Sequence, residues 1–409
     1  MVPAPLRPPA RKAVLLLIPL LQRYLRRAWR RLNRLKRRIS RLPDRLNRLW
    51  HKRLKDLKNL TLHVWLRLWR ERGRNRLAEA GDQIHLINPL QDYTGAPLRT
   101  LHLFEELKKH REVSLWSEHK VPTEITEKYP VKRIAPWRFE FPKTGTFVVV
   151  GFLALGPWIR YACPRRIIVV QIGTYMTPKK FRQRLWHISD KGRREVEVVY
   201  ASELNRRLVG DYPGFVQPSL IDIDRFVPTP RTPSGPASAS AFTIGRLSRA
   251  EPYKHHPDDP ELYRRLVEQG CQVRIMGPSP SLQEELAGLE GSVELVPMFA
   301  REAHLFLQGL DCFFYRTSEE YHEAWGRVVT EAMACGLPVV CHNHGGYVEI
   351  IEHGRNGFLF DTQQEALEIL LRLKEDRGLR ESVGTEARRT AEGLFSSAVR
   401  SEIVEFYLR

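Results

Sequence analysis

The chain has 409 residues, which is enough for two ordinary domains and an extension. Hydrophobic residues make up 42% and charged residues 28%, a balance that is typical of a folded protein and excludes a low-complexity chain. The net charge of +19 is uneven, because residues 1–80 contain 24 Lys or Arg and 4 Asp or Glu, whereas residues 81–409 contain 42 and 43. The basic character therefore belongs to an N-terminal arm.

The cysteines and the apolar runs argue against a disulfide framework and a membrane span. The five cysteines include no Cys-x-x-Cys pair, and their spacing fits neither a zinc site nor a set of disulfides. We interpret them as buried thiols in a reducing compartment. The longest apolar run, Ala13–Leu21, is too short to cross a bilayer, and arginines rather than a cleavage site follow it. We predict neither a signal peptide nor a transmembrane helix, and a cytoplasmic location.

Residues 1–80 are predicted to form a basic amphipathic helical arm. Leucine and isoleucine recur at steps of three and four from Leu32 to Leu49, and Pro43 is expected to break the helix. Four tryptophans are interleaved with the basic residues: Trp29, Trp50, Trp65 and Trp69. We favour an anionic membrane surface as the partner of residues 1–76. Nucleic acid is less favoured because no recognition motif accompanies the charge, and a solvated hairpin or an oligomerisation arm remains the alternative.

Residues 82–228 are predicted to form a first Rossmann-like domain, which would hold the acceptor. Continuous β-branched runs are expected to form strands of a parallel sheet that is covered on both faces. These runs lie at Asp82–Pro89, Thr146–Phe152, Arg165–Ile172 and Val196–Ala201. Helical patterns intervene, as in PKKFRQRLWHI.

Residues 229–240, rich in Pro, Ser, Gly and Ala, are predicted to be a linker. A second alternation of strands and helices follows in residues 241–392, and residues 393–409 read as a C-terminal helix that can cross back to the first domain. The fold class is therefore α/β, with two facing Rossmann-like domains. In such sheets ligands bind at the carboxyl ends of the strands.

The segment EAWGRVVTEAMACGLPVV, Glu323–Val340, is predicted to be a loop, a helix that starts near Gly326 and a strand from Pro338. The free N–H groups of Trp325, Gly326 and Arg327 would then form an anion site suited to a phosphate. Glu323 would precede the helix, and Glu331 would lie about one and a half turns inside it. The two carboxylates can therefore accept hydrogen bonds from sugar hydroxyls on either side of the phosphates.

This segment resembles the retaining GT-B glycosyltransferases of the group 1, family 4 type, which carry two glutamates separated by seven residues before Ala-Met-Ala-Cys-Gly-x-Pro-Val. Further similar elements are IGRLSR…K at Ile244–Lys254, the Gly-Gly loop in NHGGYVEIIEHGRNGFLF and the segment SLIDIDRFVP. The resemblance covers roughly residues 82–409 and is stronger in the second half. The resemblance implies a GT-B fold and a nucleotide-diphosphate sugar as the donor.

The resemblance also implies roles for individual residues. Arg246 and Lys254 would hold the diphosphate, Glu331 the ribose and Glu323 the hexose. The other implied donor-binding residues are Trp325, Gly326, Arg327, Gly95 in the TGAP loop, and Gly345 and Gly346 in the Gly-Gly loop. Cations placed around the leaving diphosphate would lower the barrier to transfer.

Two departures from the family pattern bear on these roles. The spacing from Arg246 to Lys254 is longer than usual, so Arg249 is a rival phosphate ligand. Where the family often has a histidine after the strand IIVVQIGT, this chain has Gln171, Ile172 and Gly173. The residue that activates the acceptor is therefore open.

Several polar residues have competing interpretations. Asp222 and Asp224 resemble a metal-binding pair but are better explained by a turn and a helix cap. His255 could lie near the phosphate, although HHPDDP is more simply a helix start. His344 could lie beside the donor sugar or pack in its loop. Glu349 could approach the nucleotide or cap a helix.

We therefore expect a retaining hexosyltransferase that transfers a hexose from a nucleotide-diphosphate sugar to an acceptor hydroxyl. The acceptor is expected to be a lipid-linked or cell-envelope glycan, and neither a metal ion nor a cofactor is expected. The alternatives are a catalytically weak scaffold or binding protein and a glycosyltransferase that acts on nucleic acid. The choice between a UDP- and a GDP-sugar, the acceptor and the oligomeric state stay open.

Overall fold

The computed structural model describes residues 27, 31, 59–64, 66, 82–92, 95–151, 155–229 and 241–409. Most of the predicted arm, with Pro43 and its four tryptophans, and the linker from residue 230 to 240 lie outside the described residues. In the described part of the chain, no helix is both long and apolar enough to traverse a bilayer.

The first domain is built on a seven-stranded parallel sheet with the order β3-β2-β1-β4-β5-β6-β7. Its interior strands are buried on both faces, which explains the continuous apolar runs of the sequence. The strands are β1 Ile84–Ile87, β2 Val113–Ser117, β3 Val131–Arg133, β4 Thr146–Val150, β5 Arg166–Gln171, β6 Glu197–Tyr200 and β7 Phe215–Val216.

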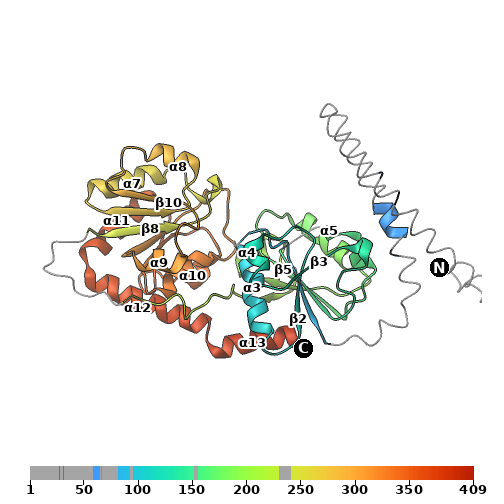
Figure 1. Ribbon diagram of the computed structural model, residues 1–409. Coiled ribbons are helices and arrows are strands. Elements are labelled where there is room, and N and C mark those ends of the chain that lie inside the picture. Colours follow the sequence, from blue (N-terminus) through green and yellow to red (C-terminus); the bar gives the residue numbers. More distant parts are fainter. Residues whose placement is uncertain are drawn as a thin grey trace, which may run out of the picture.

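Helices cover both faces of this sheet (Figure 1). On one face α3 buries Leu101 and Leu107, and on the other face α5 buries Phe181 and Leu185. The helices and short 3₁₀ turns are α3 Gly95–Leu107, α4 Thr123–Thr126, η1 Pro136–Arg138, η2 Pro157–Arg160, α5 Pro178–Ile188 and α6 Glu203–Leu208.

The second domain has a six-stranded parallel sheet with the order β10-β9-β8-β11-β12-β13. Its strands are β8 Thr243–Leu247, β9 Gln272–Met276, β10 Val293–Val296, β11 Cys312–Tyr315, β12 Val339–His342 and β13 Phe358–Phe360. Its helices and 3₁₀ turns are η3 Pro252–Lys254, α7 Asp259–Glu268, α8 Pro280–Glu285, α9 Ala303–Gln308, α10 Arg327–Ala334, η4 Gly346–Ile350 and α11 Gln363–Glu375. The predicted fold class, two facing Rossmann-like domains, is confirmed.

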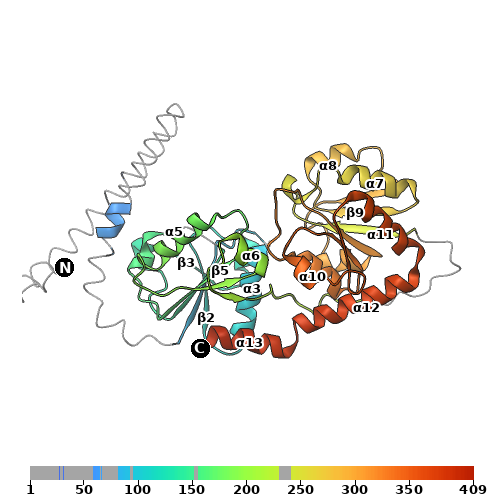
Figure 2. The ribbon, with the colours of Figure 1, turned by 180° about the vertical axis from the view of Figure 1, so that it is seen from behind.

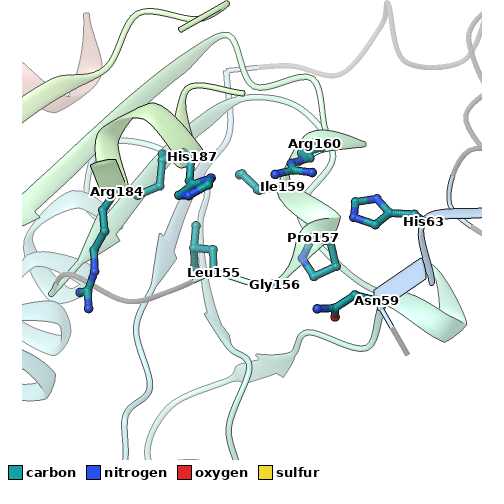
Figure 3. Close-up of a pocket in the computed structure, with 10 residues that line it drawn as sticks. Asn59, His63, Leu155, Gly156, Pro157, Ile159, Arg160, Arg184 and His187 are labelled. Carbon is teal, nitrogen blue, oxygen red and sulfur yellow. The ribbon is translucent and has the colours of Figure 1, made fainter. Parts of the chain in front are cut away.

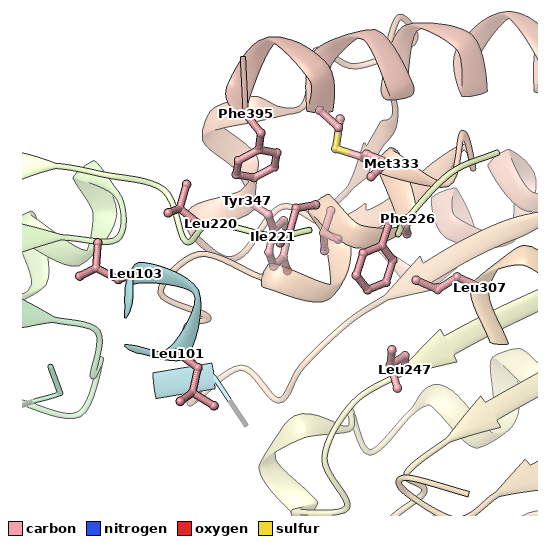
Figure 4. Packing of buried hydrophobic residues seen from close by; sticks show 14 of the residues in the cluster. Leu101, Leu103, Leu220, Ile221, Phe226, Leu247, Leu307, Met333, Tyr347 and Phe395 are labelled. Carbon is pink, nitrogen blue, oxygen red and sulfur yellow. The ribbon is translucent and has the colours of Figure 1, made fainter. Parts of the chain in front are cut away.

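The segment that leaves the first domain packs between the two domains. Leu220, Ile221 and Phe226 belong to one apolar cluster with Leu101 of α3 and Met333 of α10 (Figure 4). Because this core continues from one domain into the other, the cleft above it has a packed floor.

Two C-terminal helices run along both domains (Figures 1 and 2). Helix α12, Arg377–Leu394, packs against α10, and α13, Ser397–Leu408, lies on the first domain. Tyr407 donates a hydrogen bond of 2.8 Å from its hydroxyl to Gln217 Oε1, and Phe406 stacks on Phe215 with 4.8 Å between ring centroids. The end of the chain therefore ties the second domain to the first.

Part of the predicted arm belongs to the core of the first domain. Residues 59–64 and Leu66, which we call the arm helix, are helical. Leu62 and Leu66, four residues apart, are buried in the same cluster as Trp158 and Phe181. His63 also accepts a 2.9 Å hydrogen bond at its carbonyl oxygen from the Tyr161 hydroxyl. This end of the arm is thus anchored to the domain by apolar packing.

Candidate active site

A cavity of about 580 Å³ lies between the two domains, at the carboxyl ends of both sheets. From the first domain it is lined by Gly95, His102 and Tyr175, and from the second by Lys254 and Glu323. This is the position at which open α/β sheets bind ligands.

The start of α10 forms one wall of the cavity, as the sequence predicted. Gly326 has φ +75°, in the left-handed region, and a Cβ placed on it would lie 2.5 Å from Tyr347 Cδ1. Both the backbone and the neighbouring ring therefore require glycine here. Trp325, Gly326 and Arg327 line the cavity, so the start of α10, where backbone N–H groups have no partner within the helix, lies at its wall.

The Gly-Gly loop supports this wall from behind and does not line the cavity. Gly346 donates a 2.8 Å backbone hydrogen bond to the carbonyl of Glu323, which forms a parallel bridge with Gly345. A Cβ on Gly346 would lie 2.2 Å from the Ala324 carbonyl oxygen. The two glycines thus hold the backbone of Glu323, and neither is among the residues that line the cavity.

Lys254 and Glu323 form an ion pair in the cavity. Lys254 Nζ lies 2.5 Å from Glu323 Oε2, and the Tyr315 hydroxyl donates to the same oxygen at 2.9 Å. Burial alone would raise the pKa of Glu323, but the charge and hydrogen bond of Lys254 outweigh it and lower that pKa. Burial lowers the pKa of Lys254, and Glu323 opposes this change. The carboxylate is therefore held ionised inside the cleft.

Three tyrosines close over this ion pair from both domains. Tyr321 accepts a 2.9 Å hydrogen bond from Lys254 Nζ and lies 4.9 Å from Tyr253 between ring centroids. Tyr175 comes from the first domain and lies 5.3 Å from Tyr321 and 5.9 Å from Tyr253. The tyrosines thus bring the two domains into contact at the charged centre of the cavity.

Glu331 and Arg327 form the second ion pair of the cavity. Arg327 Nε donates to Glu331 Oε1 at 2.6 Å, one helical turn along α10, and both side chains are largely buried. Arg327 Nη1 also donates to the carbonyl of Leu220 at 3.3 Å. Glu331 therefore lines the cavity one helical turn beyond Arg327, and Arg327 joins it to the segment between the domains.

The sequence suggested Arg246 as a phosphate ligand and Arg249 as its rival, but in the structure Arg249 lines the cavity and Arg246 does not. Arg246 is 1% exposed, does not line the cavity, and donates to the Lys254 carbonyl and to Asp259 Oδ2 at 3.4 Å. Arg249 lines the cavity and reaches the Tyr253 hydroxyl at 3.3 Å. The residues inserted between Arg246 and Lys254 therefore leave Arg249, the rival ligand, beside Lys254, and Arg246 supports the loop from beneath.

The first domain contributes Gly95 and the loop after β5. Gly95 begins α3 at the cavity, with open space around its Cα. Gln171, at the end of β5, is fully buried and donates from its amide to the Gly173 carbonyl at 2.5 Å. Tyr175, four residues on, is the side chain of this loop that reaches across the cleft. His102 of α3 lines the cavity, and burial lowers its pKa to about 4, so it is neutral.

The remaining candidates have structural partners outside the cavity. His255 contacts the Gly277 carbonyl at 3.1 Å, and burial lowers its pKa to about 3. The ring of His344 is tilted against that of His322, with 4.0 Å between ring centroids. Glu349 accepts hydrogen bonds from the first N–H groups of α6, Glu203 N at 3.0 Å and Leu204 N at 2.6 Å. For these three residues the packing and capping interpretations describe the observed contacts.

Sequence reasoning did not identify several residues of the cavity, namely Tyr175, Tyr253, Tyr321, Arg99, Arg225 and Arg301. Tyr253 and Arg225 lie within the segments Ile244–Lys254 and SLIDIDRFVP, but the resemblance assigns them no role, and the other four lie in no motif. Tyr175 follows β5, the strand after which the family often has a histidine. This position is the one feature of the sequence that could have pointed to Tyr175.

The cavity is suited to a small molecule that carries negative charge. Six basic residues line it against three acidic ones: Arg99, Arg225, Arg249, Lys254, Arg301 and Arg327 against Asp222, Glu323 and Glu331. Cations and helix N–H groups bind phosphates, and buried carboxylates accept hydrogen bonds from hydroxyl groups. Among the residues that the structure describes, no group of three or more His, Cys, Asp or Glu is arranged to hold a metal ion.

Known structures share this architecture over most of the chain. The structure of Anabaena Alr3699/HepE in complex with UDP and glucose superposes with a TM-score of 0.64, at 19% identity, over 80% of this chain and 99% of that one. WaaG, a glycosyltransferase involved in lipopolysaccharide biosynthesis, superposes with a TM-score of 0.58, at 12% identity, over 79% and 99%. The two facing domains with a cleft between them are the GT-B fold.

A protein-family model matches the sequence of the second domain. Residues 237–390, which are less than half of the chain, match the family model "Glycosyl transferases group 1". The match bears out the resemblance that rests on Glu323, Glu331 and the motifs around them.

Curated relatives match over short stretches. Spore coat protein SA of Bacillus subtilis is 38% identical over 81 residues, which are 19% of this chain and 22% of that protein. Sucrose synthase 2 of Pisum sativum is 50% identical over 62 residues, 14% of this chain and 8% of that protein. These matches thus span less than a quarter of either relative.

Proposed function

We propose that the protein is a retaining hexosyltransferase that moves a hexose from a nucleotide-diphosphate sugar to an acceptor hydroxyl. One observation carries this proposal: Lys254, Arg249 and the start of α10 line one cavity together with Glu323 and Glu331, and we place the donor diphosphate at the point where these cations meet. A diphosphate at that point would meet fixed positive charge, and the leaving nucleoside diphosphate would be stabilised as its charge develops. The family match and the UDP complex of HepE support the choice of donor class.

Glu331 is proposed to bind the ribose and Glu323 the hexose. Each carboxylate already lies beside a cation, Glu331 beside Arg327 and Glu323 beside Lys254, and its oxygens can accept hydrogen bonds from hydroxyl groups. Retention would proceed on one face of the sugar, with the departing diphosphate and the incoming hydroxyl on the same side.

The acceptor is proposed to be a lipid-linked or cell-envelope glycan, used in the cytoplasm at the inner face of a membrane. The basic charge of residues 1–80 supports this, because clustered Lys and Arg beside tryptophans bind anionic lipid surfaces. Replacing Arg23, Arg26, Arg27, Arg30 and Arg31 by glutamine should weaken sedimentation with anionic vesicles. Unchanged sedimentation would remove this support.

A thermal-shift screen against UDP, GDP, ADP and their sugars tests the donor. A matching nucleotide should raise the melting temperature through linkage, and the Glu331→Ala variant should lose most of that rise. Incubation of the matching sugar with candidate acceptors then tests transfer, with Glu323→Ala as the inactive control. If no nucleotide or nucleotide-sugar stabilises the chain, the proposal fails.

A catalytically weak binding protein is the second candidate. It is favoured by the end of β5, where the buried Gln171 amide, and no histidine, occupies the strand. Donor binding without measurable transfer or hydrolysis would support this candidate over the first.

A further inference from the structure

The outer surface of α5 is basic and carries an exposed tryptophan. Residues 178–194 contain seven Lys or Arg and one Asp or Glu. Phe181, Leu185 and Ile188 point into the core, which leaves Lys179, Lys180 and Arg182 on the solvent side. Trp186 on the same helix is 53% exposed. A large apolar ring among cations on one face of a helix is the composition of a membrane-interface helix.

The arm helix lies beside α5 and adds apolar surface. Its residues Leu62 and Leu66 face the core, whereas Leu60 and Val64 point outward and are 60% and 42% exposed. Three of the seven exposed large apolar side chains among the described residues, Leu60, Val64 and Trp186, therefore belong to these two helices. Each of the three keeps about half of its surface exposed to solvent in the described structure.

A cavity of about 290 Å³ separates the arm helix from α5 (Figure 3). Asn59 and His63 line it from the arm helix, and Arg184 and His187 from α5. Its remaining wall is mostly apolar and comes from Leu155, Gly156, Pro157 and Ile159, followed by Arg160. The cavity thus combines an apolar wall with two arginines and two histidines. It lies on the first domain, apart from the cleft.

We propose that α5, the arm helix and the cavity between them form a docking surface for an anionic phospholipid membrane. Trp186, Leu60 and Val64 would enter the interface, the basic side chains of α5 would meet anionic headgroups, and Arg160 and Arg184 would bind a lipid phosphate at the cavity. Charge complementarity selects this occupant, because this face is strongly basic and the arm helix belongs to a segment, residues 1–80, whose sequence is more basic still.

The position of α5 links this surface to the cleft. Helix α5 begins at Pro178, three residues after Tyr175, which lines the cleft. Docking at α5 would therefore bring the acceptor side of the cleft close to the bilayer. That consequence rests on the proposed function, whereas docking itself does not.

Vesicle sedimentation of the full chain tests the surface without measuring activity. The variant Lys179→Glu/Lys180→Glu/Arg182→Glu is compared with Lys108→Glu/Lys109→Glu/Lys128→Glu, which makes the same charge change by α3 and α4, at the other face of the sheet from α5. Because the basic arm is intact in both variants, a difference between them in vesicle binding reports the contribution of α5. On phosphatidylcholine vesicles with phosphatidylglycerol, we expect the α5 variant to partition about tenfold more weakly than the control. Equal partitioning of the two variants overturns the proposal.

Two further measurements keep the test decisive. Trp186→Ala, which changes no charge, should reduce partitioning several-fold, and hydrogen exchange on vesicles should slow in α5 and in the arm helix. Unchanged binding of Trp186→Ala together with unchanged exchange in both helices would also overturn the proposal. Inorganic phosphate, added at constant ionic strength, should leave vesicle binding intact. If phosphate abolishes vesicle binding, the cavity is assigned to a free anion instead of a lipid.

Discussion

Lys254 and Glu323 neutralise each other at the centre of the cleft, with 2.5 Å between Nζ and Oε2. Lys254 follows β8 and Glu323 precedes α10, so the pair joins two segments that are 69 residues apart in the chain. The proposed donor would share both charges, because its phosphate would approach the amine and its sugar hydroxyls would approach the carboxylate. The pair is therefore a preorganised site, and removal of either member leaves a buried charge without its partner.

Glu323→Gln and Lys254→Met should each lower kcat/KM for transfer by about a hundredfold or more, because each removes a charge that acts at the donor. The double variant should lose much less than the product of the two single losses, since the two residues act as one unit. Steady-state kinetics on the four proteins measure this coupling. The exposed Glu320→Gln serves as control, and strictly additive losses would speak against a functional pair.

Arg246→Met should destabilise the fold, by about 3–5 kcal/mol, because it leaves the fully buried Asp259 without its charge partner. Arg249→Met should change the unfolding free energy little and weaken nucleotide binding instead. Urea denaturation and nucleotide titration separate the two effects. If the Arg246→Met protein has normal stability but fails to bind the nucleotide, Arg246 itself contacts the donor and this prediction is wrong.

Gly326→Ala should abolish most of the activity and lower the melting temperature, because a Cβ meets the Tyr347 ring 2.5 Å away. Gly354→Ala is the matched control, since Gly354 has a similar φ of +79° with open space around it. Both variants bear the strain of a left-handed residue, about 1–2 kcal/mol, and only the first adds the clash. Similar melting temperatures for the two would show that Tyr347 moves aside without cost.

Tyr175→Ala should impair use of the acceptor more than binding of the donor. Its ring comes from the first domain and reaches Tyr253 and Tyr321 across the cleft. We expect a several-fold rise in KM for the acceptor, an almost unchanged dissociation constant for the nucleotide, and recovery in Tyr175→Phe, which keeps the ring. A loss confined to nucleotide affinity would place Tyr175 at the donor instead.

Folding stability should fall as the pH is lowered from about 6.5 toward 4. Burial depresses the pKa of His85, His102 and His342 to about 4 and that of His255 to about 3, below the ordinary value of 6.5. Between these values the unfolded chain binds more protons than the folded one, so acid favours unfolding. Urea denaturation at pH 7 and pH 5 measures the slope.

The variant His255→Asn should reduce that slope, whereas His110→Asn, at an exposed position, should leave it unchanged. A free energy of unfolding that is equal at pH 7 and pH 5 would contradict the buried neutral histidines.

The sequence was sufficient for the class of fold and for the start of α10. Continuous β-branched runs such as that of β5 predict parallel strands because both faces of such a strand are buried. Gly326 before a helical pattern predicts the helix start because few other residues tolerate a left-handed backbone. Short strands with weaker patterns, β2 and β3, were missed, because pairing within the sheet decides them: β2 pairs with β1, and β3 pairs with β2.

Only the tertiary structure decided which charged residues face the ligand. Arg246 and Arg249 are three residues apart and chemically equal, and burial against Asp259 removes Arg246 from the cleft while Arg249 lines it. Tyr175 carries no motif and enters the site because the two domains meet there. Local sequence sets backbone preferences, which act between near neighbours. The direction of a side chain in a cleft depends instead on packing between residues far apart in the chain, and such contacts exist only in the folded molecule.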